Sequence, residues 1–357
     1  MSNQLSSGQV GQSETPASAE RNQSSIMRRT RGLRESGLGK FARATVLAPE
    51  FSLVIAIAIF GAITTTRNDS FLTYSNLILV VKSAAPTFVV AITMTFVLIG
   101  GGIDLSVGSM AGLGGLVTAM ALQDHLPIIL AICLGIVVCG AVGAGIGVVI
   151  TKFHIPALIV TLGGLYAIRG VVLILTNSQQ VFPLPSAFDA IGQSSLGDIP
   201  SLVFIAIGFG IIGHLALSKF KFGYHIRAIG GNAAAARAVG IKVDRMRIVL
   251  YALSGVGAAI AGILTTSFVG DGDPSFGQGM ELSVIAAVIV GGASLFGAVG
   301  SVPGTALGVL FLALITNGFL LMRISANWQF VVQGIVVVAA VGVDQIRRIR
   351  IRKLSAG

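Results

Sequence analysis

Long apolar runs constrain this chain more than any other feature of its sequence. Runs of about 20 such residues match the thickness of the bilayer hydrocarbon, and they follow one another along most of the 357 residues. Only 11% of the residues are charged, whereas a soluble domain carries about 25%. So few charges cannot cover a water-facing surface, which excludes an ordinary soluble enzyme, a disordered protein and a nucleic-acid-binding protein.

The runs predict an all-α, polytopic transmembrane helix bundle of about ten spans, because backbone amides in lipid must be hydrogen-bonded within their own segment. This domain covers residues 46–346 and is flanked by a disordered basic tail, 1–45, and a basic tail, 347–357. We expect broken or re-entrant helices where glycine pairs interrupt a run. The predicted spans are 47–66, 76–100, 105–122, 127–151, 156–176, 200–218, 247–267, 282–300, 302–322 and 327–344.

Lysine and arginine residues predict the orientation of these spans. Twenty of the 24 lie in the N-terminal tail, at Lys152, between residues 219 and 247, or in the C-terminal tail. The positive-inside rule places all four regions in the cytoplasm, and ten crossings then leave both termini inside. A re-entrant hairpin at 282–300 would put the C-terminal tail outside, so we expect one crossing there.

The most informative string runs from Gly100 to Ser109 and reads GGGIDLSVGS. Three glycines allow a sharp reversal or an unwound segment. Asp104 then lies at or near the N-cap of the next helix, with Ser106 and Ser109 in its first turns. An acidic residue at membrane depth is costly unless it faces protein or water. Two compatible interpretations stay open, a buried cap that fixes the break and a direct contact with a substrate.

Two basic residues, Lys82 and Arg169, also lie within predicted spans. Each could line an aqueous cavity, pair with a carboxylate or extend to the membrane interface. A pair between Lys82 and Asp104 is one option, and extension to the interface fits Arg169, which lies toward the outer end of its span.

A second informative string lies in the cytoplasmic segment 219–246. Asn232 is a good N-cap residue, four alanines with the best helix propensity follow it, and Gly240 is well placed to end the helix. The positive-inside rule requires only basic charge here. A short helix with both ends capped therefore predicts a docking element for a partner, with a plain basic loop as the alternative.

A possible internal repeat and several absent motifs complete the sequence evidence. Residues 101–109 resemble 291–301, which predicts either pseudo-symmetric halves or independent enrichment of small residues. The G-x-x-x-G pairs at Gly143/Gly147 and Gly304/Gly308 predict close helix contacts. The sequence has no phosphate-binding P-loop, no metal-ligand spacing among its four histidines and no catalytic Ser/His/Asp or Cys/His arrangement. We therefore expect a protein that is not an enzyme and holds neither metal nor cofactor.

The two strings, in this order and at this separation, resemble the membrane permease subunits of ribose/simple-sugar ABC importers. The resemblance covers residues 45–346. The chain departs from it at Ala234 and Ala235, where relatives often carry Pro or Glu, so an acidic contact to the partner is not assumed. Further matching segments are 157–161 with Arg169-Gly170, 222–241, Glu281 with 286–292, and Asn317-Gly318.

This resemblance implies a permease in the bacterial inner membrane that works with three kinds of partner. These are a cytoplasmic ATP-binding subunit, a periplasmic sugar-binding protein and a second permease subunit, in a homodimer surrounded by lipid. The imported solute would be a pentose or hexose. The helix at 232–240 resembles a coupling helix, with Gly231, Asn232, Ala236, Arg237 and Gly240 as the coupling residues. For the translocation path we expect polar groups near helix breaks, namely Asp104, Ser106, Ser109, Thr161 and Asn317.

Other membrane functions are weaker alternatives. An ion-coupled secondary transporter needs a relay of intramembrane carboxylates, and Asp104 is the one strong candidate in the sequence. A channel would need a ring-forming selectivity motif, and a membrane enzyme would need a catalytic cluster.

Overall fold

The computed structural model describes residues 49–325 and scattered positions between 327 and 345. Within these residues the regular secondary structure is helical apart from one two-stranded hairpin. The predicted tails, 1–45 and 347–357, lie outside the described residues, and the predicted span 327–344 is described only in part.

Six helices are long and apolar enough to cross a bilayer. Three shorter apolar helices accompany them, and each of these helices coincides, wholly or in part, with a predicted span. The described part of the chain thus confirms an all-α polytopic membrane protein. The six are α4 (Tyr74–Ile99), α6 (Ile128–Lys152), α7 (Ala157–Thr176), α9 (Ser201–Ser218), α12 (Val243–Val269) and α14 (Val302–Leu321), and the three are α3 (Pro49–Thr65), α5 (Val107–Gln123) and α13 (Met280–Val290).

Within the predicted span 282–300 the helix breaks at the pair Gly291-Gly292, as expected where glycine pairs interrupt an apolar run. Helix α13 has 11 residues, which at 1.5 Å per residue reach about 16 Å, roughly half of the bilayer hydrocarbon. It ends at Gly291 because Gly292 adopts a φ of 92°, in the left-handed region that glycine tolerates best. The chain then continues without a helix until Ser301, the N-cap residue of α14.

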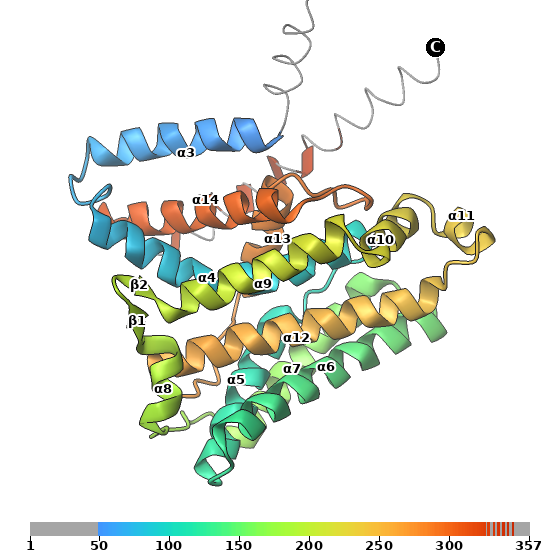
Figure 1. Cartoon of the computed structure of the whole chain (residues 1–357), viewed down its shortest axis with the longest axis horizontal. Coiled ribbons are helices and arrows are strands. Elements are labelled where there is room, and N and C mark those ends of the chain that lie inside the picture. Colours follow the sequence, from blue (N-terminus) through green and yellow to red (C-terminus); the bar gives the residue numbers. More distant parts are fainter. Residues whose placement is uncertain are drawn as a thin grey trace, which may run out of the picture.

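The connecting elements divide between the two ends of the bundle. Helices α10 (Lys221–Gly231) and α11 (Ala233–Ala238) lie at one end, and α8 (Ser186–Gln193) lies at the other (Figure 1). The hairpin strands β1 (Ser195–Leu196) and β2 (Ile199–Pro200) lie next to α8 and pair antiparallel, with Ser195 opposite Pro200. The basic segment 219–246 and the segment 177–199, which contains no lysine or arginine, therefore lie at opposite ends of the bundle, which agrees with the charge pattern.

Helix α12 is the central helix, and it packs against α4, α5 and α6. Its approach to α6 is close because Gly143 lies against the Tyr251 backbone and Gly147 lies against Ile248. Gly262 of α12 meets the Ala111 carbonyl of α5 in the same way. A side chain at any of these glycines would collide with backbone of the facing helix. The predicted G-x-x-x-G contact at Gly143/Gly147 is confirmed.

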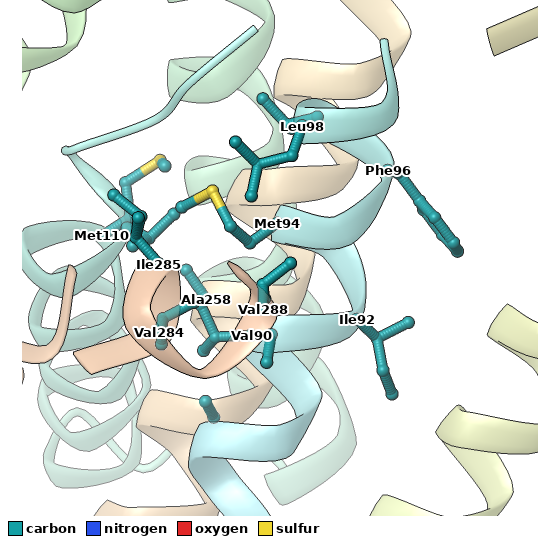
Figure 2. Packing of buried hydrophobic residues seen from close by; sticks show 14 of the residues in the cluster. Val90, Ile92, Met94, Phe96, Leu98, Met110, Ala258, Val284, Ile285 and Val288 are labelled. Atoms are coloured by element: carbon teal, nitrogen blue, oxygen red, sulfur yellow. The ribbon is translucent and has the colours of Figure 1, made fainter. Parts of the chain in front are cut away.

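The C-terminal half of α4 is buried on every side. Figure 2 shows Met94 lying toward Met110 of α5 and toward α13, while Ile92 and Phe96 point in the opposite direction. On that opposite side, Ile92 packs against Gly213 of α9, and the Phe96 ring meets the Phe222 ring of α10 edge to face at 5.6 Å. This core holds the end of α4, and the non-helical segment that follows it, in a fixed position.

Candidate functional site

The first glycine break (residues 100–106) joins α4 to α5. Helix α4 ends in a hydrogen-bonded glycine cap, in which the amide of Gly101 bonds to the Leu98 carbonyl and the amide of Gly102 bonds to the Val97 carbonyl. Gly101 has a φ of 76°, a conformation that favours glycine. The sequence prediction of a glycine break at this place is therefore confirmed.

Asp104 lies inside the first glycine break and is completely buried. Its Oδ1 accepts hydrogen bonds from the Ser106 amide at 2.9 Å and from the Ser106 hydroxyl at 2.6 Å. Helix α5 begins at Val107 with Ser106 as its N-cap residue, so Asp104 supports the turn before the helix and does not cap the helix itself. Ser254 of α12 is also fully buried and lies beside the Asp104 carboxylate.

Helix α7 closes over the start of α5. The Ser109 hydroxyl donates to the Leu165 carbonyl of α7 at 2.7 Å, and Gly164 lies against the Ser106 side chain. Thr161 is fully buried on the same helix, and its hydroxyl donates to the Ala157 carbonyl of its own preceding turn. The structure thus places Ser106 and Ser109 at the α5–α7 contact, while Asp104 bonds to Ser106 and lies beside Ser254 of α12.

Asn317 lies elsewhere, on α14. Its side chain exchanges two hydrogen bonds with Asn76 of α4, at 2.9 and 2.8 Å. It also lines a cavity of about 430 Å³ between α4, α13 and α14, which we call the polar groove. The polar side chains that line this groove are Ser83, Thr87, Ser283, Thr316 and Asn317.

Four of the groove residues were not predicted from the sequence. Ser83 and Thr87 are four residues apart, so they lie on one face of α4. That spacing is a readable signal, since two hydroxyls on one face of an otherwise apolar span mark a side that faces protein or water. Ser283 and Thr316 carry no comparable local signal, because only the packing of α13 against α14 brings them to the same groove.

The short capped helix predicted within segment 219–246 is present, and we call residues 232–240 the coupling knob. The Asn232 side chain accepts hydrogen bonds from the amides of Ala234 and Ala235, both at 3.0 Å, and so caps α11. Gly240 has a φ of 85° and donates to the Arg237 carbonyl at 3.0 Å, which ends the helix.

The residues predicted for coupling have two kinds of environment. Gly231, Asn232, Arg237 and Gly240 are exposed. Ala236 is buried in a small apolar cluster with Ile229 of α10 and Val243 of α12, so it packs the knob against these two helices. Val239, which was not predicted, is 77% exposed at the tip.

The two basic residues within spans bind protein groups. The Lys82 ammonium lies 4.3 Å from the centre of the Phe268 ring of α12, a cation–π contact. Arg169 donates to the carbonyls of Pro274 and Phe276 at 2.7 and 2.9 Å, and so holds the α12–α13 connection onto α7. Arg169 therefore ties two segments together, which differs from the expected extension to the interface.

The second glycine break (residues 291–301) joins α13 to α14, and its start repeats the geometry of the first. The amides of Gly291, Gly292 and Ala293 bond to carbonyls four, three and five residues back, as do those of Gly100, Gly101 and Gly102. The same pattern also ends α5, α11 and α14, so it is the common hydrogen-bonded end of a helix and does not test the suspected repeat.

The chain was compared with known protein families. A family model described as "Branched-chain amino acid transport system / permease component" matches residues 76–341, which include both glycine breaks, the polar groove and the coupling knob. No solved structure matches the chain.

Individual relatives cover most of the chain. The ribose import permease protein of Escherichia coli (strain K12) is 34% identical over 316 residues, which cover 87% of this chain and 97% of that protein. The ribose import permease protein of Bacillus subtilis (strain 168) is 35% identical, with coverages of 84% and 92%. The xylose transport system permease protein of Escherichia coli (strain K12) is 32% identical, with coverages of 83% and 91%.

Proposed function

This chain belongs to the family of transport-system permease components, and on that premise we propose that it is the membrane subunit of an ABC importer for a monosaccharide. It would lie in the bacterial inner membrane as a multi-pass protein. A separate cytoplasmic ATP-binding subunit would supply the energy, and a periplasmic sugar-binding protein would deliver the solute.

The substrate class rests on the named relatives. The family description refers to branched-chain amino acids, whereas the similar proteins that cover most of this chain are named for ribose and xylose. Four of the five polar side chains in the polar groove are hydroxyls and the other seven lining residues are apolar, which suits a solute that carries both hydroxyl groups and C–H faces, as a monosaccharide does. Hydroxyl side chains exchange hydrogen bonds with a pentose or hexose at little cost.

Among the observations on this structure, the coupling knob best supports a separate ATP-binding subunit as the source of energy. It is a capped helix whose outer residues are exposed at the end of the bundle that the charge pattern assigns to the cytoplasm (Figure 1). Its stability comes from its own caps and its own apolar base. A preformed protrusion of this kind loses little entropy when it docks into a partner.

The polar groove supports a pathway shared by two copies of the chain. Ser83 is exposed beside the groove, and Thr87, Ser283 and Asn317 lie along it. Polar side chains that face lipid are costly at membrane depth. We infer that a second copy covers this face, so that the solute passes between polar surfaces of the two subunits. The fully buried group around Asp104 would then fix the helix break beside the pathway.

The decisive experiment is reconstitution of the permease in vesicles with its ATP-binding subunit and binding protein. We expect ATP-dependent uptake of radiolabelled ribose or xylose and no uptake of leucine. Arg237→Ala and Gly240→Val should reduce retention of the ATP-binding subunit, because the first removes an exposed cation and the second strains a backbone with positive φ. Lys219→Ala, an exposed charge outside the knob, is the matched control.

Two results would reject this proposal. Uphill uptake by the permease alone, without any ATP-hydrolysing partner, would remove the need for coupling. Retention and uptake in both knob variants at the level of Lys219→Ala would show that the partner docks elsewhere.

A further inference from the structure

The two glycine breaks touch each other at the cytoplasmic end of α4. The Ala298 amide of the second break donates to the Ile99 carbonyl at the end of α4, at 2.8 Å. Gly230, in the last turn of α10, lies against both of these groups, and a side chain there would collide with each. The two irregular connections and the helix that precedes the coupling knob therefore meet at one point.

Helix α10 also binds the second break through a side chain. Arg227 donates from Nη2 to the Gly300 carbonyl at 3.0 Å and from Nη1 to the Ala298 carbonyl at 3.3 Å. A planar guanidinium presents two donors in a fixed geometry, so these bonds hold the position and the direction of the loop together.

Helix α12, which follows the knob in the chain, contacts the first glycine break. The Tyr251 hydroxyl donates to the Ile103 carbonyl at 3.2 Å, and Ser254, one turn further along, lies beside Asp104. A cavity of about 280 Å³ separates the knob from this break and is lined by Arg237, Tyr251 and the backbone of residues 100–102. The first break thus has free volume on the side that faces the knob.

The knob connects these two contacts as one body. Ile229 of α10, Ala236 of α11 and Val243 of α12 share one apolar cluster. Arg237 of α11 forms an ion pair with Asp244 in the first turn of α12, at 2.6 Å. Exposed ion pairs contribute little stability, so the apolar cluster is the main reason why α10, α11 and the start of α12 move together.

We propose that Arg227 and Tyr251 are positioning residues through which the coupling knob moves both glycine breaks at once. This proposal rests on the proposed function and adds the route by which docking of the ATP-binding subunit reaches the pathway. Arg227 transmits displacement of the knob to the start of α14, and Tyr251 transmits it to the start of α5. Both helices carry a residue assigned to the pathway: Asn317 is part of α14, and Ser109 is part of α5.

The first test measures sugar imported per ATP hydrolysed in reconstituted complexes. Arg227→Ala should retain the ATP-binding subunit within twofold of wild type and keep hydrolysing ATP, while import per ATP falls at least tenfold. Arg227→Lys keeps a cation and should recover part of the coupling. Tyr251→Phe keeps the ring and loses only the hydroxyl, so import per ATP should fall severalfold. Lys221→Ala removes an exposed charge from the same helix and should match wild type.

Import per ATP in Arg227→Ala at the level of Lys221→Ala would overturn the proposal. Loss of the ATP-binding subunit in proportion to loss of import would also overturn it, because Arg227 would then act in docking alone. Failure of the proposed function is seen separately, as absence of ATP-dependent sugar import by the unmutated complex.

The second test measures rigid-body movement without reference to transport. Spin labels on cysteines at Tyr224 of α10 and Val299 of the second break, both more than half exposed, report the distance between the knob body and the loop. The exposed native Cys133 is replaced by alanine beforehand. We expect the distance to stay constant when ATP is added to the complex, and to change or broaden in Arg227→Ala. A shift in the unmutated background would overturn the proposal.

Discussion

Asn76 and Asn317 pair side chain to side chain, with each amide donating to the other's carbonyl oxygen at 2.9 and 2.8 Å. The pair joins α4 to α14 at one end of the polar groove. Asn76 also donates to the Phe71 carbonyl at 2.8 Å. Because Asn317 lines the groove while Asn76 supports it, the pair offers a way to separate a contact with solute from a contact between helices.

Replacing either asparagine by alanine removes the same reciprocal pair. We expect Asn317→Ala to lower stability by about 1–2 kcal/mol, which is the range of interhelical hydrogen bonds in membranes, and Asn76→Ala to lower it somewhat more, because that variant also loses the bond to the Phe71 carbonyl. Thermal unfolding in detergent, followed by circular dichroism, measures this. Sugar uptake should fall more in Asn317→Ala, since that variant also loses a group in the groove. Equal loss of uptake in the two variants would show that Asn317 acts through the pair alone.

Substitutions of Asp104 test whether this residue stabilises the first glycine break or contacts the solute directly. Asp104→Asn keeps an acceptor for the Ser106 amide and hydroxyl, so we expect its stability to stay within about 1 kcal/mol of wild type. Asp104→Ala leaves the Ser106 amide buried without that partner and should cost about 2–3 kcal/mol. A stable Asp104→Asn protein with normal uptake supports the structural role. A stable protein without uptake would contradict it.

Glycine contacts of α12 should tolerate no side chain. Gly262→Ala places a methyl group against the Ala111 carbonyl of α5, and such overpacking costs about 1–3 kcal/mol. We expect a lower melting temperature and partial aggregation on size-exclusion chromatography. Gly145→Ala on α6 meets nothing within 4 Å and serves as the control. It should be as stable as wild type or slightly more so, because alanine is the better helix former; equal damage in both variants would refute the packing argument.

The cap of the coupling knob should affect partner binding more than global stability. Asn232→Ala loses two hydrogen bonds to the amides of Ala234 and Ala235, a local cost of about 1 kcal/mol. We expect the ATP-binding subunit to dissociate severalfold faster, as measured by surface plasmon resonance on the solubilised permease. Asn232→Ser restores a capping oxygen and should restore binding. If Asn232→Ala bound normally, the folded state of α11 would not matter for docking.

Local chemistry made part of this molecule predictable. The knob formed as expected because its signals, an Asn cap, a run of alanine and a terminal glycine, act within ten residues. The first glycine break was predictable for the same reason. The apolar runs predicted the spans because lipid leaves a backbone no alternative to the helix.

Features that depend on packing between segments far apart in the chain were not predictable from the sequence. Helix α8, between α7 and α9, was not predicted, since its stability depends on α12: the Gly192 amide donates to the Ser267 hydroxyl, and this hydroxyl donates to the Phe188 carbonyl. The polar groove was missed because α13 and α4 are far apart in the chain. The glycine pair Gly291-Gly292 predicted the break after α13 but not its length, because hydropathy does not register that no helix resumes before Ser301.

The glycine contacts of α12 have a mechanical consequence. Where Gly143, Gly147 and Gly262 meet a facing helix, the contacts are backbone against backbone or against small atoms. At these three contacts no facing side chain would need to change rotamer for α12 to slide, whereas the Thr93 side chain of α4 packs against Gly257 of α12 and resists the same movement. Shear of α12 is therefore least hindered along the faces where backbone meets backbone.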